Sequence, residues 1–203
     1  MITLFHAPQS RSSRMIWLLE ELRVAYEIRP VSIFRPMTGE GQADPANPHP
    51  DGRVPAVVHD GKLLAESVAI VLYLLDAFPQ AGLAPAPDDA RRGDYLTWIA
   101  WYVAELEPAL FAGMAGDLAG SPQKQRNYDA VIARLRAALA GGLYLMGDTF
   151  TGADFLVSSA MAFGRQAFPA DEVFDAFIER CQSRPAAIRA RALDGQAGVQ
   201  TPA

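Results

Sequence analysis

Short apolar runs and helix-spaced apolar positions alternate along the first 80 residues of the chain. Residues 2–5 form a short continuous apolar run, which is typical of a buried strand. Between residues 15 and 22 the apolar side chains recur with the spacing of one helical face, and between 26 and 31 they alternate with polar ones. The pattern predicts a strand, a helix and a second strand, which together make a βαβ unit.

A hairpin followed by a helix is predicted between residues 54 and 78. Residues 54–58 are rich in β-branched side chains, and Asp60-Gly61 is a turn signal, because both central positions of a type I′ turn need a positive φ. Residues 62–64 form the return strand. After Glu66, apolar positions recur at i, i+3, i+4 and i+7, which predicts a helix (Val68, Val71, Leu72 and Leu75).

The order of these elements fixes the fold class of the first domain. Residues 32–50 are rich in proline, glycine and polar groups, so they form a loop or a short helix. With them included, the order becomes β-α-β-(α)-β-β-α, which is that of a thioredoxin-like α/β domain spanning residues 1–80.

The rest of the chain is predicted to be helical. Residues 81–87 belong to a stretch rich in proline that cannot be helix or central strand, so they are the domain linker. From residue 88 to about 197 no stretch has the pattern of a strand, and apolar positions recur with helical spacing, broken at residues 116–122 and ended at Gly141-Gly142. This predicts an all-α helical-bundle domain over residues 88–203.

A capping box is predicted near the middle of the second domain. In Thr151-Gly152-Ala153-Asp154 the threonine hydroxyl can accept a backbone N–H inside the helix, while the aspartate reaches back to the N–H of the threonine. The helix that follows is apolar around nearly its whole circumference, so we expect it at the centre of the bundle.

Composition and charge exclude several classes of function. The chain has 203 residues, of which 50 % are apolar, and a net charge of −5 without a basic run, so nucleic acid and anionic membranes are not expected partners. No apolar run of 18 residues exists, and the amino terminus enters a strand directly without a signal-peptide pattern. A single cysteine, Cys181, excludes an internal disulfide, and the three histidines have no metal-ligand spacing. We therefore expect a cytoplasmic protein without a metal.

Two features around the hairpin point to a binding site. Pro55 stands at the start of a strand, which makes sense if the bond before it is cis and the backbone groups of Val54 face a ligand. Glu66-Ser67 places a carboxylate, a hydroxyl and free N–H groups at a helix start, which suits an α-amino, α-carboxylate group. A proline turn and an ordinary helix cap explain the same residues, and the sequence leaves both interpretations open.

The first 80 residues resemble a glutathione transferase. The resemblance rests on the Ser-x-x-x-Arg pattern of Ser10 and Arg14, on Gly-Arg-Val-Pro-Ala-Val at 52–57, and on Leu-Ala-Glu-Ser-Val-Ala-Ile at 64–70. The phrase His-Pro-Asp-Gly-Arg-Val-Pro is closest to a serine-type subgroup typified by the yeast endoplasmic-reticulum transferase. The Phe-Thr-Gly-Ala-Asp-Phe stretch resembles the capping box of the same family, so the resemblance spans nearly the whole chain.

The resemblance implies a role for each site residue. Ser10 would stabilise a thiolate with its hydroxyl, although an ordinary helix N-cap is the alternative. The backbone of Val54 would hold the cysteinyl part of glutathione, and Glu66 and Ser67 its γ-glutamyl end. Arg53 would meet the glycyl carboxylate, although it can equally be a solvated loop arginine.

Four further histidine and aromatic residues have expected roles. His49 could serve the same glycyl carboxylate as Arg53, whereas His6, at the end of a strand, is expected to be structural. The resemblance implies that Tyr102 or Trp98 lines the pocket for a second substrate, because the corresponding helix borders that pocket in the family.

The expected function is therefore conjugation of the glutathione thiolate to a small hydrophobic electrophile, in detoxification, by a homodimer. Glutathione is the co-substrate. A glutathione-dependent disulfide reductase or peroxidase, and a transferase-like binding protein without catalysis, are the alternatives. The sequence does not name the electrophile, because the second-substrate pocket has no motif.

Overall fold

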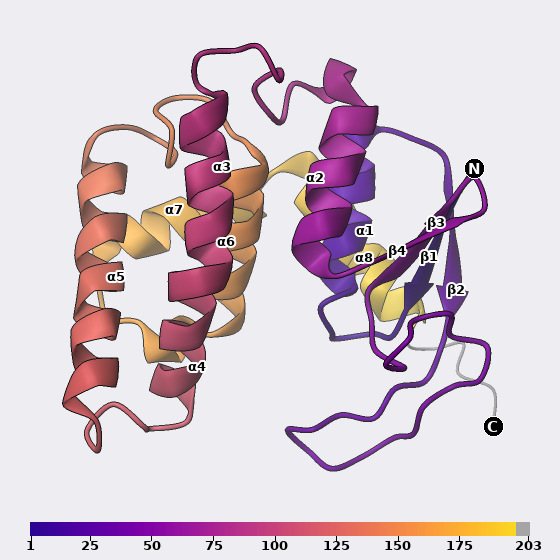
Figure 1. Ribbon diagram of the computed structural model, residues 1–203, viewed down its shortest axis with the longest axis horizontal. Helices are drawn as coiled ribbons and strands as arrows, with labels where there is room; N and C mark the ends of the chain where they lie inside the picture. Colours follow the sequence, from indigo (N-terminus) through magenta and orange to yellow (C-terminus); the bar gives the residue numbers. More distant parts are fainter. Residues whose placement is uncertain (198–203) are drawn as a thin grey trace. The chain divides into compact units, whose positions relative to one another are not determined.

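The computed structural model describes residues 1–197 as two compact units (Figure 1). Among the described residues, the first unit contains residues 1–81 and 184–197, and the second contains residues 82–183. The two units meet in sequence at Ala81 and Gly82, inside the predicted linker.

The first unit is built on one mixed sheet of four strands. The strands are β1 (Ile2–His6), β2 (Tyr26–Pro30), β3 (Ala56–His59) and β4 (Lys62–Ala65), and they lie in the order β2-β1-β3-β4. β1 pairs with β2 in parallel, as a βαβ unit requires, and both β1–β3 and β3–β4 are antiparallel. The thioredoxin-like fold class predicted from the order of elements is confirmed.

The hairpin has the predicted turn. His59 pairs with Lys62, so Asp60 and Gly61 are the two loop residues, and their φ angles are 49° and 80°. Both are positive, as a type I′ turn demands, and glycine tolerates this without a Cβ clash.

Helices α1 (Ser13–Leu22) and α2 (Ser67–Ala77) lie side by side on the sheet, and a short 3₁₀ turn, η1 (Pro79–Ala81), follows α2 (Figure 1). The predicted buried face of α2 begins at Val68. In the structure the first buried residue of the helix is Ser67, which is polar. Val68 and Leu72 are only half-buried; the buried residues of α2 are Ser67, Ile70, Val71, Leu74 and Leu75.

The last helix, α8 (Pro185–Ala197), packs on α1 and belongs to the first unit. The predicted division placed everything from residue 88 to 203 in the second domain, and the structure differs at this helix. Helix α1 is buried on nearly all sides and needs a second cover besides the sheet. The guanidinium of Arg184 donates to both carboxylate oxygens of Glu21 at 2.6 and 2.8 Å, and Arg189 donates to Glu20 at 2.7 Å.

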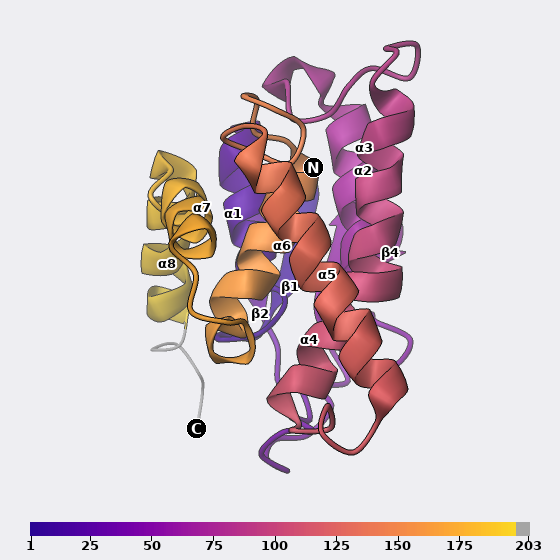
Figure 2. The ribbon, with the colours of Figure 1, turned by 90° about the vertical axis from the view of Figure 1, so that its left-hand side faces the viewer.

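The second unit contains only helices among its described residues. Figure 2 shows α5 running past α4, and α5 packs against both α4 and α7. The helical elements are α3 (Arg92–Trp101), a π-helical segment η2 (Tyr102–Leu106), α4 (Glu107–Met114), α5 (Pro122–Ala140), α6 (Gly152–Phe163), η3 (Arg165–Ala167) and α7 (Glu172–Gln182). The predicted breaks fall between α4 and α5 and after α5, as expected from the glycines there. Helix α6 packs against α3 and α7 and is buried along most of its length, although Phe163 at its end is 58 % exposed.

The predicted capping box is present at the start of α6. The Asp154 carboxylate accepts the N–H and the hydroxyl of Thr151 at 2.8 and 2.9 Å. It also accepts the N–H of Leu145 at 2.8 Å, which ties the loop after α5 to the same carboxylate. Asp154 is completely buried, so each of these bonds replaces one that water would otherwise make.

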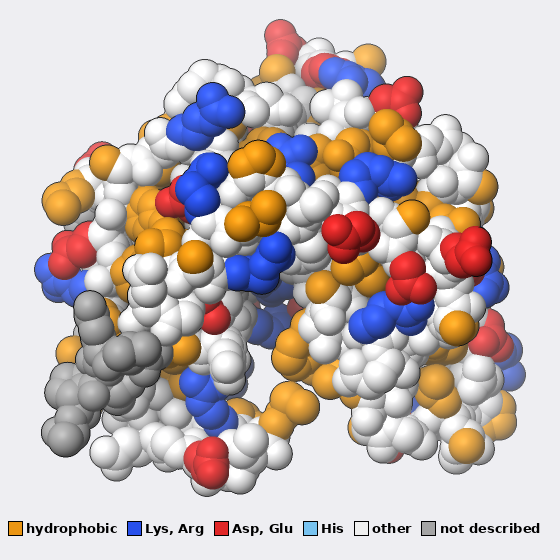
Figure 3. All heavy atoms as spheres, turned by 180° about the vertical axis from the view of Figure 1, so that it is seen from behind, with side chains coloured by type: hydrophobic (Ala, Val, Ile, Leu, Met, Phe, Trp, Pro, Cys, Tyr) orange, Lys and Arg blue, Asp and Glu red, His pale blue; other side chains and the backbone are white. Residues whose placement is uncertain are grey.

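The surface carries charges of both signs in mixture. On the face drawn in Figure 3, the positive and negative side chains are interspersed and no large basic area forms. Among residues 1–197, no helix combines the length and the apolar character that crossing a membrane requires.

Candidate functional site

The sheet brings three separate segments to one edge of the first unit. Phe5, near the end of β1, pairs with Ala56 at the start of β3, and Ala56 also pairs with Ala65 at the end of β4. The loop after β1, the residues before β3 and the start of α2 therefore lie next to one another. A small apolar cluster joins the first two of these segments (Phe5, Ala7, Val31, Val54 and Ala56).

Val54 has the arrangement predicted for a residue that pairs with a ligand. Its side chain is buried in that cluster, and the Val54–Pro55 peptide bond is cis, as predicted. Within the described chain, no hydrogen bond outside the regular elements engages the N–H or the carbonyl of Val54. Both groups remain available for strand-like pairing.

Glu66 and Ser67 form an unusual start of α2. Glu66 is the N-cap residue with φ 66° and ψ 122°, a conformation that costs a non-glycine residue roughly 1–3 kcal/mol. Ser67 is only 6 % exposed, and its hydroxyl has no hydrogen-bond partner among the described residues. A buried hydroxyl without a partner is costly, and a polar ligand at the helix start would satisfy it.

Ser10 lies in the loop between β1 and α1, and it is half-buried. Its hydroxyl donates to the Ala7 carbonyl at 2.7 Å, lies 2.8 Å from the Ser12 hydroxyl, and accepts the Ser12 N–H at 3.1 Å. Helix α1 begins at Ser13, and Ser12 before it makes no side-chain cap bond. The Ser10 hydroxyl accepts the N–H of Ser12, and the Ser10 carbonyl accepts the N–H of Ser13 at 3.0 Å. Ser10 thus keeps the hydrogen bonds expected of a cap.

The hydroxyls of the two neighbouring serines, Ser12 and Ser13, already make hydrogen bonds to other groups. Ser12 is completely buried, and its hydroxyl accepts the Ala7 N–H at 3.1 Å and lies 2.8 Å from Nδ1 of His6. The hydroxyl of Ser13 accepts the Ser10 N–H at 3.1 Å and donates to Asp194 at 2.6 Å. Ser10 is therefore the serine hydroxyl best placed to meet a ligand.

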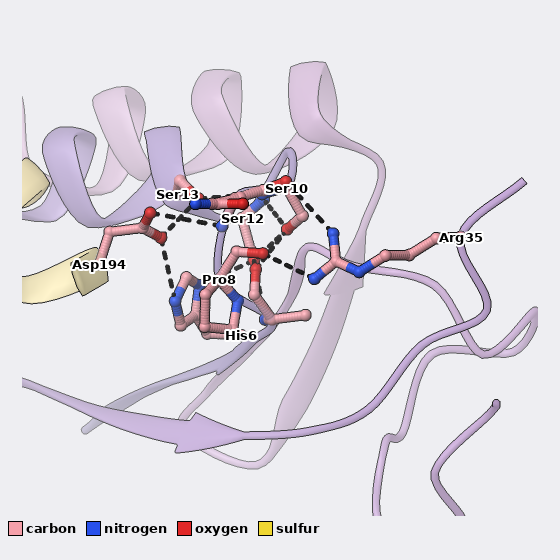
Figure 4. A network of polar contacts seen from close by, with 9 residues as sticks. His6, Pro8, Ser10, Ser12, Ser13, Arg35 and Asp194 are labelled. Carbon is pink, nitrogen blue, oxygen red and sulfur yellow. Dashed lines mark hydrogen bonds and ion pairs between the residues drawn. The ribbon is translucent and has the colours of Figure 1, made fainter. Parts of the chain in front are cut away.

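Asp194, on α8, reaches into this loop (Figure 4). Besides Ser13, its carboxylate accepts the Gln9 N–H at 3.3 Å. One of its oxygens lies 3.2 Å from Nε2 of His6, at ion-pair distance but without the alignment of a hydrogen bond. Burial lowers the pKa of the His6 imidazole below its usual range, and the Asp194 carboxylate opposes part of that shift.

Arg35 holds the same loop from its other side (Figure 4). Its guanidinium donates to the carbonyls of Pro8 at 2.7 Å and Gln9 at 3.3 Å. Gln9 has a positive φ of 54°, so the loop needs such external contacts to hold its shape.

Arg53 and His49 occupy the segment before β3. The Arg53 side chain is exposed, and its carbonyl accepts the side-chain amide of Asn47 at 2.9 Å. His49 is buried, and its Nδ1 accepts the N–H of Asp51 at 3.1 Å. In the neutral ring the hydrogen therefore resides on Nε2, which makes that nitrogen a donor.

The aromatic residues Trp98, Trp101 and Tyr102 make their contacts within the second unit. Tyr102 is almost completely buried and donates to Glu107 at 2.5 Å, so it does not line an open pocket. Trp101 is buried and packs edge-on against Trp98, and the Arg134 guanidinium lies 4.6 and 4.9 Å from the centroids of the Trp98 and Trp101 rings. Cation–π contacts of this kind stabilise the packing of α5 on α3.

The sequence pattern indicates only a structural role for His6, and it gives no signal for Arg35 or Asp194, the two other residues of the loop network. Asp194 is 185 residues from Gln9 along the chain, and no motif surrounds it. A group of three or more His, Cys, Asp or Glu side chains suited to a metal ion does not occur in the described chain.

Two sequence comparisons both find similarity to glutathione S-transferases. Residues 4–82 match the model of the glutathione S-transferase N-terminal domain. Glutathione S-transferase 3 of Schizosaccharomyces pombe is 32 % identical over 177 residues, which cover 84 % of this chain and 70 % of that protein.

Solved structures of glutathione S-transferases are similar to this chain over almost its whole length. A glutathione S-transferase from Actinobacillus pleuropneumoniae superimposes with a TM-score of 0.82 at 25 % identity, covering 96 % of this chain and 93 % of that one. A sphingomonad glutathione S-transferase complexed with glutathione has a TM-score of 0.74 at 26 % identity, covering 95 % and 98 %.

Proposed function

Because the chain belongs to the glutathione S-transferase family, we propose that it binds glutathione in its first unit and conjugates the thiolate to a small hydrophobic electrophile. The observation that carries the binding site is the buried hydroxyl of Ser67, which lacks a partner beside the strained Glu66. A γ-glutamyl group has the charged amino and carboxylate groups that these two residues and the N-terminal end of α2 would bind.

The rest of the glutathione molecule follows the edge of the sheet. The free backbone groups of Val54 would pair with the cysteinyl part, which places the thiol near the loop after β1. Arg53 would bind the glycyl carboxylate, and Nε2–H of the buried His49 is a second donor within the same segment.

Ser10 would make the protein a transferase of the serine type. A hydroxyl that donates to the sulfur favours the thiolate over the thiol. This requires the Ser10 hydroxyl to turn away from the Ala7 carbonyl, to which it donates at 2.7 Å.

A retention test on immobilised glutathione, followed by assays with a panel of electrophiles and a mixed disulfide, tests the proposal. We expect specific retention and conjugation activity. Retention with turnover of the mixed disulfide alone would favour a disulfide reductase, in which glutathione must supply the thiol, because Cys181 is completely buried. Retention without any turnover would favour a binding protein, and no retention would refute the proposal.

Replacing Ser10 by alanine should raise the pKa of the bound thiol by about one to two units. One hydrogen bond to a charged acceptor contributes roughly 1.5–3 kcal/mol, and one pKa unit corresponds to about 1.4 kcal/mol. Conjugation at neutral pH should fall by about tenfold or more and recover in part at higher pH. The measurement is the ultraviolet absorbance of the bound thiolate against pH, with Ser32→Ala, an exposed serine of the same unit, as the control. Identical titration curves for Ser10→Ala and the wild type would remove Ser10 from the mechanism.

The protein should be a cytoplasmic homodimer, as the family resemblance implies. Trp101 is buried inside its own unit and cannot supply the interface, so exposed apolar side chains must do so, such as Tyr73 on α2 and Leu96 on α3. Sedimentation at micromolar concentration measures the mass. A species of 22 kDa, the mass of one chain, would contradict this prediction.

A further inference from the structure

A continuous chain of polar atoms leads from the Ser10 hydroxyl into the interior of the first unit (Figure 4). Ser10 Oγ lies 2.8 Å from Ser12 Oγ, and Ser12 Oγ lies 2.8 Å from Nδ1 of His6. On the far side of the ring, Nε2 lies 3.2 Å from the Asp194 carboxylate. Each of the first two contacts has the length of a good hydrogen bond.

We propose that His6, with Asp194 behind it, accepts the proton of the glutathione thiol through Ser12 and Ser10. The inference rests on the proposed function, since it requires glutathione in the site. It gives the protein an internal proton acceptor, where the sequence showed no base beside Ser10.

The hydrogen bonds that join Ser10, Ser12 and His6 can be donated toward His6 or toward Ser10. For the transfer, the Ser12 hydroxyl donates to Nδ1 of a neutral His6, and the Ser10 hydroxyl turns from the Ala7 carbonyl to donate to Ser12. When the thiol transfers its proton to Ser10 Oγ, the former hydroxyl proton of Ser10 passes to Ser12, and that of Ser12 passes to Nδ1. The S–H bond breaks, sulfur keeps its electron pair, and His6 becomes an imidazolium. Every hydrogen bond then points toward the thiolate.

Charge and burial suit this role. His6 is completely buried and its pKa is lowered by burial, so in the absence of a ligand it is neutral at neutral pH and able to accept a proton. Asp194 is the charged group that acts on the ring, and its carboxylate stabilises the imidazolium once it forms. The thiolate adds a second negative charge at the other end of the chain, as in other thiolate–imidazolium pairs.

Asp194 also holds the loop that carries this row of hydrogen-bonded side chains in place. It accepts the Gln9 N–H and the Ser13 hydroxyl, so it holds the residues on both sides of Ser10. Ser13 in turn accepts the Ser10 N–H, which fixes the backbone from which the Ser10 hydroxyl projects. Helix α8 thus contributes a residue to the thiol site.

Proton counting on the wild-type protein tests the proposal without any substitution. Glutathione is added to weakly buffered protein at neutral pH, and thiolate absorbance and proton release are measured together. S-methylglutathione, which has no thiol proton, corrects for protons released by other groups. We expect less proton release than thiolate formed, because the thiol proton stays on His6. Release of one proton for each thiolate, or the absence of a thiolate signal, would overturn the inference.

Two substitutions on α8 form a matched pair. Asp194→Asn removes the counter-charge of His6, and we expect the thiolate fraction at neutral pH to fall by about threefold to tenfold, with proton release rising toward one per thiolate. Arg189→Gln removes a different link between α8 and α1, and should leave both quantities unchanged. Removing a negative charge near sulfur would by itself increase the thiolate fraction, so the sign separates the two explanations. An increase, or equal behaviour of the two variants, would overturn the inference, whereas failure of the wild type to bind glutathione would refute the proposed function itself.

Discussion

Replacing Asp154 by alanine should lower the free energy of unfolding by about 3 kcal/mol. A lost helix cap alone costs about 1 kcal/mol, and each buried donor left without an acceptor adds about 1–3 kcal/mol. Here the substitution leaves two buried N–H groups, those of Leu145 and Thr151, without their acceptor. The effect should therefore exceed that of an exposed cap by a clear margin.

Urea titration of the wild type and the variant measures this difference. Asp148→Ala is the matched control, because Asp148 is exposed in the same loop and accepts one long bond from Leu143 at 3.4 Å. The control should change stability by less than about 0.5 kcal/mol. Glutathione affinity of the folded fraction should be unchanged in both variants. A native urea midpoint combined with lost binding in Asp154→Ala would contradict the structural role.

The same carboxylate should make stability depend on pH. Burial raises the pKa of Asp154 to about 6, although its hydrogen bonds from Leu145 and Thr151 work against the shift. The unfolded chain has the ordinary aspartate pKa of about 3.9, so the folded state binds this proton more tightly. The stabilisation is present in full below the unfolded pKa and is lost as the pH rises through about 6. The stability advantage of the wild type over Asp154→Asn should therefore shrink from about pH 4 to pH 7. An advantage that grows over this range would show the opposite shift.

Replacing Ser67 by alanine should weaken glutathione binding by about tenfold or more without lowering the melting temperature. A hydrogen bond from a hydroxyl to a charged ligand group contributes roughly 1.5–3 kcal/mol, and 1.4 kcal/mol is a factor of ten in affinity. In the free protein the hydroxyl has no partner among the described residues, so its removal relieves a desolvation cost and breaks no bond. Binding and stability should thus change independently.

Calorimetric titration with glutathione and a thermal melt give the two quantities. Ser158→Ala is the matched control, since Ser158 on α6 is also a buried hydroxyl without a partner in the described chain, but lies in the second unit. It should leave the affinity unchanged. Glu66→Gln should weaken binding like Ser67→Ala, because it removes the charge that meets the α-amino group. Unchanged affinity in both Glu66→Gln and Ser67→Ala would place the ligand elsewhere.

The parts of the fold that depend on neighbouring residues were predictable from the sequence. Asp60-Gly61 set the hairpin because the turn geometry is determined by the two residues themselves. The capping box likewise lies within four consecutive residues, from Thr151 to Asp154. Val54, Glu66 and Ser67 could be proposed because proline and a helix start constrain the backbone beside them.

What the sequence could not predict depends on contacts between distant segments. The loop around Ser10, between β1 and α1, is held by Arg35, from the long loop after β2, and by Asp194, from the last helix. The sequence placed α8 in the helical second domain, because a helix start shows where a helix begins but not the surface on which the helix packs. The hydroxyl of Ser12, just before α1, makes no helix cap bond, and its burial beside His6 and Ala7 decides its partners.

The return of α8 to the first unit affects how the chain folds during synthesis. Residues 1–81 leave the ribosome first, but the helix that covers α1 follows only after the whole second unit. At a translation rate of about 5–20 residues per second, this leaves α1 uncovered for roughly 5–20 seconds. During that interval the loop around Ser10 also lacks its contact to Asp194. The nascent chain can therefore form its sheet early, while the loop around Ser10 gains its contact to Asp194 only after α8 has been translated.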